Sequence, residues 1–218
     1  MLHGLLFAAI AAGPVFPPPA TYRYAATLGG QPIGDWSASV KPTGTGIEID
    51  ENSTALFAGM QLAATATLVL GPDFAPISYD GSYRVPGQTP TVDVKLTPTS
   101  ATVSGTLTSA PRQLGLSPNT RHFVVIEPGL LAGLFVLPAQ AGAWNDPTMT
   151  WITPTSAQAQ PITIDQSGSA PRPPGVPAQD ALLSIDRPIV VSIWYDPATR
   201  VPDEVAVPSQ GAVLTRER

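Results

Sequence analysis

The chain has 218 residues, of which 12% are charged and 43% are hydrophobic, and its formal net charge is -5. A typical globular domain carries about 25% charged residues, so this composition fits a protein with a sizeable core and excludes a disordered polyelectrolyte. Two lysines and dispersed arginines form no basic stripe for nucleic acid, and the absence of cysteine excludes disulfides and thiolate metal ligands.

The N-terminus has the pattern of a signal peptide. An apolar run from Leu5 to Ala12 ends in small residues of the A-x-A type and is followed by a proline-rich exit. This run is shorter than the roughly 18 apolar residues that mark a transmembrane helix, and no later segment approaches that length. We expect 1–20 to be a signal peptide with its exit, and 21–218 to be a single β-rich domain without a transmembrane segment. The expected location is periplasmic or secreted; a buried first strand is the alternative.

Most of the remaining chain alternates apolar and polar residues, which is the period of a β-strand. Residues 21–40 predict a hairpin around Gly-Gly-Gln-Pro, and 91–104 predict another around Thr-Pro-Thr. Asp80-Gly81 is typical of a type I′ turn. The 26 prolines are scattered along the whole length, which argues against long helices.

Residues 129–137 depart from this alternation. Leu130, Leu131, Leu134 and Phe135 fall at helical spacing with almost no polar face. The proline that follows is expected to end the helix after about two turns. Such an apolar helix either fills the core or covers an apolar cleft on the concave face of a curved sheet.

The closing stretch 194–216 predicts two strands and the turn between them. It also holds Asp196, Asp203 and Glu204, and two carboxylates about 5–9.5 Å apart can hydrolyse a glycosidic bond. Trp194 and its neighbour would then be a platform for the sugar. However, Asp-Pro is typical of a turn, and the alternating valines place the other two acids on the solvent face of a strand. We therefore expect no catalytic residue here, and a carboxylate-dependent hydrolase stays as an alternative.

Two further features have a chemical and a structural interpretation. Without the signal peptide His122 is the only histidine, and no G-x-S-x-G motif accompanies it, so we interpret it as structural. Glu48 and Asp50 share one strand face and could ligate calcium, but an EF-hand loop is absent and a solvated face fits better. No cofactor and no metal are expected.

Three segments together resemble a known group of proteins: LGGQPIG at 28–34, the F-V…L-x-x-x-F-x-L-P pattern at 123–138, and WYDPATRVPDEVAVPSQG at 194–211. The group consists of uncharacterised exported bacterial proteins with a domain of unknown function. The resemblance implies a β-rich fold similar to the half-barrel of periplasmic lipoprotein carriers, in which helices close an incomplete barrel over an apolar cavity. It implies no activity.

These observations predict a mainly β fold, a curved antiparallel sheet or half-barrel with one short apolar helix. The expected function is non-enzymatic binding of a lipid or other apolar ligand. The alternatives are an accessory protein that binds a cell-envelope partner through a sheet edge, and the hydrolase. The ligand is expected to contact aromatic residues of the inner face and apolar residues of the helix: Trp36, Phe57, Leu131, Leu134, Phe135, Trp151 and Trp194.

Overall fold

The computed structural model describes residues 15–57, 59–127, 129–168 and 170–218, so most of the predicted signal peptide lies outside the described residues. Within these ranges no helix is long and apolar enough to cross a membrane. The helices are α1 (Ala132–Trp144) and the short 3-10 helix η1 (Pro208–Gln210). The strands are β1 (Thr21–Leu28), β2 (Gln31–Pro42), β3 (Ile47–Phe57), β4 (Met60–Leu70), β5 (Pro76–Arg84), β6 (Thr91–Leu96), β7 (Ser100–Ser104), β8 (Arg112–Gly115), β9 (Phe123–Val125), β10 (Thr148–Thr153), β11 (Gln158–Asp165), β12 (Ala181–Ile185), β13 (Val191–Tyr195), β14 (Pro202–Val207) and β15 (Ala212–Arg216).

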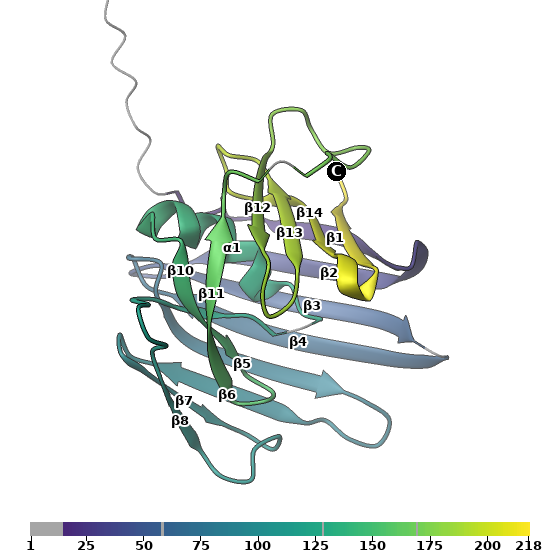
Figure 1. Ribbon diagram of the computed structural model, residues 1–218. Helices are drawn as coiled ribbons and strands as arrows, with labels where there is room; N and C mark the ends of the chain where they lie inside the picture. Colours follow the sequence, from purple (N-terminus) through teal and green to yellow (C-terminus); the bar gives the residue numbers. More distant parts are fainter. Residues whose placement is uncertain (1–14, 58, 128, 169) are drawn as a thin grey trace, which may run out of the picture.

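All the strands belong to one sheet, in the order β8 to β1 followed by β15 to β9. Neighbouring strands are antiparallel except β9 and β10, which are parallel and joined by a crossover that contains α1. The sheet is curved, because β8 contacts β11 and β5 contacts β9 although these strands lie far apart in the strand order. Figure 1 shows α1 between the N-terminal and the C-terminal strands. The predicted curved antiparallel sheet with one apolar helix is confirmed.

In the long N-terminal strands, buried residues alternate with less buried ones, and the buried residues form the inner face of the sheet. In β2 the buried residues are Trp36, Ala38 and Val40, and in β4 they are Ala66, Leu68 and Leu70. The predicted hairpin of β1 and β2 is present, and its register shifts where Ala26 faces Gly34 and the next residue faces Pro32. This bulge bends the first hairpin at the rim of the concave face.

Asp80-Gly81 does not form the turn that its sequence predicts. Asp80 lies within β5 and pairs with Thr67 on one side and Asp93 on the other. A Cβ at Gly81 would lie 3.0 Å from the ring of Tyr79 and 3.2 Å from the hydroxyl of Tyr83. Glycine therefore makes room for two aromatic side chains, and the long flanking strands outweigh the local turn propensity.

Helix α1 is longer than predicted, and Pro138 lies inside it rather than at its end. A proline in a helix interior costs about 3 kcal/mol, because a backbone donor is lost and the ring clashes with the preceding turn. Here every residue from Ala132 to Ala141 is buried, so tertiary packing of the whole segment offsets this cost. The close packing is clearest at Gly133, where a Cβ would lie 1.9 Å from the carbonyl oxygen of Val125 in β9.

Candidate functional site

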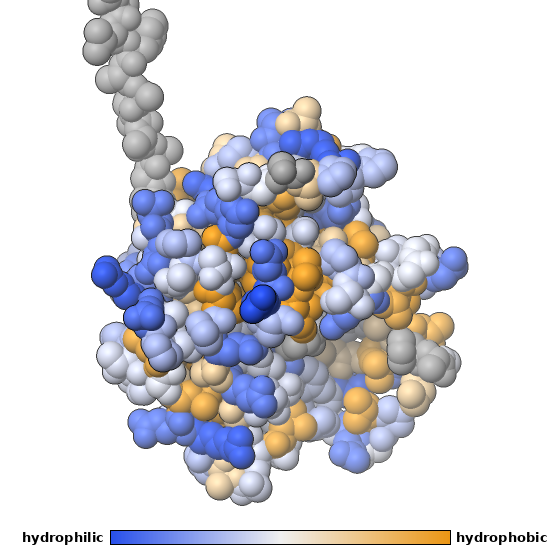
Figure 2. Space-filling model, in the orientation of Figure 1, coloured by the Kyte–Doolittle hydropathy of each residue, from blue (hydrophilic) through white to orange (hydrophobic). Residues whose placement is uncertain are grey.

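An apolar cavity of about 370 Å³ opens between the sheet and the start of α1. Its innermost residues are buried, among them Trp36, Ser53 and Leu134, whereas other lining residues such as Gln210 are exposed. Figure 2 shows hydrophobic side chains gathered in the middle and at the right of one face of the molecule. The full lining is Ala26, Thr27, Leu28, Ile33, Trp36, Ser53, Ala55, Leu62, Ala63, Ala64, Tyr83, Arg84, Val85, Gly129, Leu130, Leu134, Val207, Gln210, Ala212, Val213 and Leu214.

Two strands hold the segment that forms the inner wall of this cavity. The indole nitrogen of Trp36 in β2 donates a hydrogen bond to the carbonyl oxygen of Gly129, at 3.1 Å. Glu51 in β3 accepts hydrogen bonds from the backbone N–H of Leu131 at 2.8 Å and of Ala132 at 2.6 Å. These hydrogen bonds hold the segment that places Leu130 and Leu134 in the cavity wall. The wall on this side depends on contacts between residues about 80 to 90 positions apart.

Glu51 caps the N-terminus of α1 in place of a residue of the helix itself. The helix has no side-chain cap of its own and no acidic residue in its first turn, so its free N–H groups need an external acceptor. The Glu51 side chain is buried, with the residue 1% exposed. Burial raises the pKa of Glu51 to about 7, although the N–H groups of Leu131 and Ala132 act to lower it.

A second buried carboxylate, Glu127, comes just before the same segment in the chain. Its oxygens accept hydrogen bonds from the backbone N–H and the hydroxyl of Thr155, at 2.8 and 2.6 Å. Burial raises the pKa of Glu127, and the bonds from Thr155 oppose this shift. Burial raises the pKa of Tyr83, which lines the cavity, and the charges of Glu127 and Glu51 act in the same direction.

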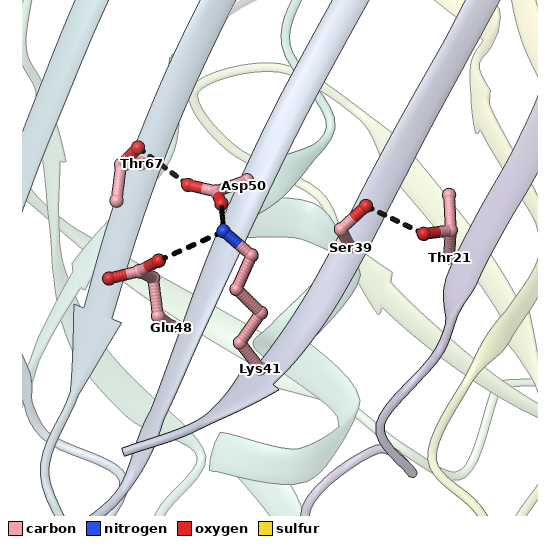
Figure 3. A network of polar contacts seen from close by, with 6 residues as sticks. All are labelled: Thr21, Ser39, Lys41, Glu48, Asp50 and Thr67. Atoms are coloured by element: carbon pink, nitrogen blue, oxygen red, sulfur yellow. Dashed lines mark hydrogen bonds and ion pairs between the residues drawn. The ribbon is translucent and has the colours of Figure 1, made fainter.

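Strand parity contains the signal for Glu51, but the sequence prediction did not use it. Ile47 and Ile49 are buried on the inner face of β3, and Glu51 and Ser53 continue this face at the same period. Glu48 and Asp50 have the opposite parity and lie on the outer face, where Lys41 pairs with both (Figure 3). Asp50 also accepts a hydrogen bond from the hydroxyl of Thr67, at 2.8 Å.

The structure brings two of the predicted ligand-contacting residues, Trp36 and Leu134, to the cavity. Leu131 and Phe135 are not among the lining residues, and both are fully buried in the core. Trp151 is also a core residue, and its indole nitrogen donates to the carbonyl oxygen of Ile126 at 2.8 Å.

Trp194 lies in a separate small cluster with Val176 and Leu182, under the guanidinium of Arg172. It is therefore absent from the cavity lining. Phe57 ends β3, but its side chain lies outside the described part of the structure. Sequence reasoning did not identify the small residues that make the space, above all Ala55 and Ala64.

The acids of the closing stretch have structural partners. Asp196 forms the predicted turn: its carboxylate accepts hydrogen bonds from Ala198 and Thr199, at 2.8 and 3.0 Å. The expected solvent exposure of Asp203 and Glu204 is wrong, since both are buried. Asp203 pairs with the terminal arginines Arg216 and Arg218, at 3.2 and 3.3 Å, because β14 and β15 are neighbours.

Asp180 is a buried acid that the sequence prediction did not single out. Neither carboxylate oxygen has a hydrogen-bond partner within the described residues. Burial and the nearby Asp203 raise the pKa of Asp180 to about 7. Arg172 donates only to the backbone oxygen of Asp180, at 2.9 Å.

His122 packs against Trp144, the last residue of α1. Its ring stacks on Trp144 with ring centres 4.2 Å apart and an angle of 6° between the planes. The Trp144 indole donates to the carbonyl oxygen of Asp73, at 2.7 Å, which ties the end of the helix to the loop after β4. Burial lowers the pKa of His122, and Asp146 opposes this shift.

Fold and cavity define a mainly β protein whose curved sheet wraps around one buried helix and leaves an apolar pocket beside the N-terminus of the helix. No protein-family model and no curated protein matches the sequence. Among solved structures, the chain is similar to the crystal structure of a DUF1089 family protein from Pseudomonas aeruginosa, with a TM-score of 0.50 and 7% identity. The similarity covers 91% of this chain and 95% of that chain.

At 7% identity this similarity shows the fold alone. It agrees with the predicted resemblance to an uncharacterised bacterial domain of unknown function. Export and similarity to the lipoprotein carriers are not addressed by it and stay predictions.

Proposed function

We propose that the protein is a non-enzymatic binding domain that holds a lipid chain or another apolar group in the cavity beside α1. The observation that carries this proposal is the cavity itself, whose volume of about 370 Å³ falls in the roughly 300–1,000 Å³ range of small-molecule sites. Export to the periplasm or beyond is part of the proposal and rests on the N-terminal signal-peptide pattern.

The lining favours an apolar ligand over a polar one. Alkyl groups from Ile33, Leu62, Leu130 and Leu214 form much of the wall. Transfer of a hydrocarbon chain from water to such a wall gains about 25 cal/mol per Å² of apolar surface buried. The side chains of Val207, Leu214 and other rim residues are only half-buried, so the apolar surface continues to the mouth and offers a chain a way in.

The other two functions considered from the sequence have less support. Hydrolysis was predicted to use Asp196 with Asp203 or Glu204, and both carboxylate oxygens of Asp196 are engaged in its turn while Asp203 pairs with two arginines. Binding of an envelope partner through a sheet edge would use β8 or β9, the outermost strands. Both remain predictions without a specific structural observation in their favour.

Filling the cavity is expected to abolish binding. Ala64 in β4 lines the cavity, so Ala64→Phe places a ring in the space that the ligand would occupy. We expect the affinity for an uncharged hydrophobic fluorescent probe, N-phenylnaphthylamine, to fall by at least about tenfold. Fluorescence titration of the purified chain measures this change.

The matched control is Thr65→Phe, one residue further along the same strand, where the side chain is exposed on the outer face. It should leave the probe affinity within about a factor of two, because it adds no volume to the cavity. Ala55→Leu offers a second, smaller filling variant should Ala64→Phe prevent folding, which circular dichroism reports. Equal affinity in the wild type and in a folded filling variant would contradict the proposed site.

A further inference from the structure

Four turns at one end of the sheet contain no charged residue. They join β1 to β2, β3 to β4, β5 to β6 and β14 to β15, and they share this end because the strands between them are antiparallel neighbours. The sequence holds no Asp, Glu, Lys, Arg or His over 24–34, 52–72, 85–92 and 205–215. Arg84, which directly precedes one turn, has the strand parity of the outer face of β5. These four turns are called the uncharged rim.

The cavity opens at the uncharged rim. The β1–β2 and β14–β15 turns are joined there by a hydrogen bond from the backbone N–H of Gly29 to the carbonyl oxygen of Gly211, at 2.8 Å. All four turns, with the strand ends beside them, contribute lining residues that are half-buried or exposed: Leu28, Ile33, Ala55, Leu62, Val85, Val207 and Gln210. The path from the cavity to the outside therefore runs between uncharged turns.

The β3–β4 hairpin projects from the uncharged rim. Its two strands pair with each other as far as Phe57 and Met60. By contrast, β2 follows β3 only as far as Ala55, and β5 follows β4 only from Ala63. In Figure 1 the hairpin reaches further to the right than the neighbouring strands. Leu56 is 61% exposed and Met60 is 48% exposed, and these two side chains form what we call the hairpin tip.

The two side chains of the hairpin tip belong to opposite faces of the hairpin. Met60 has the strand parity of Leu62 and Ala64, so the apolar inner face continues from the cavity to the tip. Leu56 has the parity of Asp50 on the outer face, where the cavity gives no reason for an apolar residue. Exposed apolar side chains that gather in one place mark interaction sites. An apolar tip exposed on both faces fits a medium that surrounds it, as the interior of a lipid layer does.

The absence of charge indicates which lipid surface the uncharged rim fits. A charged side chain loses its hydration when it enters the boundary between head groups and acyl chains, and the rim has none to insert. Anionic lipids attract clusters of basic residues, which the rim also lacks, and the net charge of -5 opposes such a surface. Burial of apolar area is then the source of affinity, which favours a surface with neutral head groups.

We propose that the uncharged rim docks on a lipid surface with electrically neutral head groups, the hairpin tip foremost, so that the cavity opens toward the lipid. The inference builds on the proposed function, because the lipid layer would supply or receive the apolar ligand of the cavity. The ligand would then pass between layer and cavity without crossing water, and the apolar inner face between Ala64 and Met60 would form part of its path.

Co-sedimentation of the full chain with phosphatidylcholine vesicles tests the docking. Leu56→Asp and, separately, Met60→Asp are each expected to weaken vesicle binding by about tenfold or more, because each replaces an apolar contact by a charge that must lose its hydration. Neither residue lines the cavity, so both variants should bind N-phenylnaphthylamine as the wild type does, which also shows that they are folded. Neither added salt nor the removal of salt should change wild-type binding much, and added phosphatidylglycerol should not strengthen it.

Ile77→Asp is the matched control, because it makes the same kind of change at a side chain that is 47% exposed, at the opposite end of β5. It should leave vesicle binding within about a factor of two. If the wild type binds the probe but not the vesicles, or if both folded tip variants bind vesicles as the wild type does, the docking is overturned and the proposed function stands.

Two other results would also overturn the docking on a neutral lipid surface. One is binding that requires anionic lipid. The other is a lipid-free dimer of the wild type that Leu56→Asp dissociates in analytical ultracentrifugation, which would make the uncharged rim an interface between two copies of the chain. Vesicle binding that the tip variants lose, in a wild type that fails to bind the probe, would instead support the docking and contradict the proposed function.

Discussion

Replacement of Glu51 by alanine is expected to lower the free energy of unfolding by about 3 kcal/mol at pH 5. The variant leaves the backbone N–H groups of Leu131 and Ala132 buried without an acceptor, and each such group costs about 1–3 kcal/mol. No residue of α1 itself can replace the cap. Urea denaturation followed by circular dichroism measures the change. A loss below about 1 kcal/mol would show that the helix does not depend on the Glu51 side chain.

The control is Glu48→Ala, three residues earlier on the outer face of β3. Glu48 pairs with Lys41 at 3.4 Å on a surface where the side chains are 33% and 57% exposed. Exposed ion pairs contribute at most about 1 kcal/mol, so this variant should be close to the wild type. The comparison separates the role of a helix cap from the general loss of a glutamate.

The effect of Glu51→Ala should also depend on pH. Burial raises the pKa of Glu51 to about 7 in the folded protein, above the value of 4.5 of a free glutamate. The folded state therefore holds the proton more tightly, and the contribution of Glu51 to stability falls as the pH rises from about 4.5 to about 7. The variant loses this dependence, so it should be destabilised less at pH 8 than at pH 5. Equal destabilisation at both pH values would contradict a raised pKa.

Gly133→Ala is expected to destabilise the protein by about 3 kcal/mol, although alanine favours a helix by about 1 kcal/mol over glycine. The new methyl carbon would lie 1.9 Å from the carbonyl oxygen of Val125 and 3.0 Å from the Cα of Ile126, and both are backbone atoms that cannot rotate away. The helix would have to move off β9, and Leu134, the next residue, would leave the cavity wall. Thermal unfolding and the probe titration should therefore change together.

Gly142→Ala is the matched control in the same helix. There the nearest atoms belong to the guanidinium of Arg200, the flexible end of a long side chain, at 3.0 Å. The helix propensity of alanine should dominate, and the stability should stay the same or rise by up to about 1 kcal/mol. Unchanged stability of Gly133→Ala would mean that α1 does not pack against β9 as closely as described.

Strand alternation predicted much of the sheet, because strands such as β2 and β4 have one face toward the core and one toward solvent, whereas β9, β10 and β14 are buried on both faces. Turn chemistry explains why the turn at Asp196 was predicted correctly, whereas the period put Asp203 and Glu204 in solvent although β14 is buried on both faces there. Asp80-Gly81 and Pro138 were misread for a common reason: local propensity favoured a turn and a helix end, and tertiary packing outweighed both.

The candidate site was harder to predict than the fold. A cavity is made by small residues such as Ala55 and Ala64, and an alanine in a strand does not indicate whether it faces a packed core or an open space. The large aromatic residues were the natural candidates, but Trp151 and Trp194 fill other parts of the structure. Glu51 was predictable in principle, from its place on the buried face of β3.

Photo-labelling can locate a bound fatty acid chain within the protein. A fatty acid of about twelve carbons with a diazirine at the end of its chain is bound to the full protein, activated by light and located by mass spectrometry of peptides. The label should appear on residues around Trp36, Ser53 and Leu134 at the inner end of the cavity, and excess dodecanoate should suppress it. Labelling confined to the outer face of the sheet, or labelling that dodecanoate does not suppress, would mean that the cavity does not hold the fatty acid.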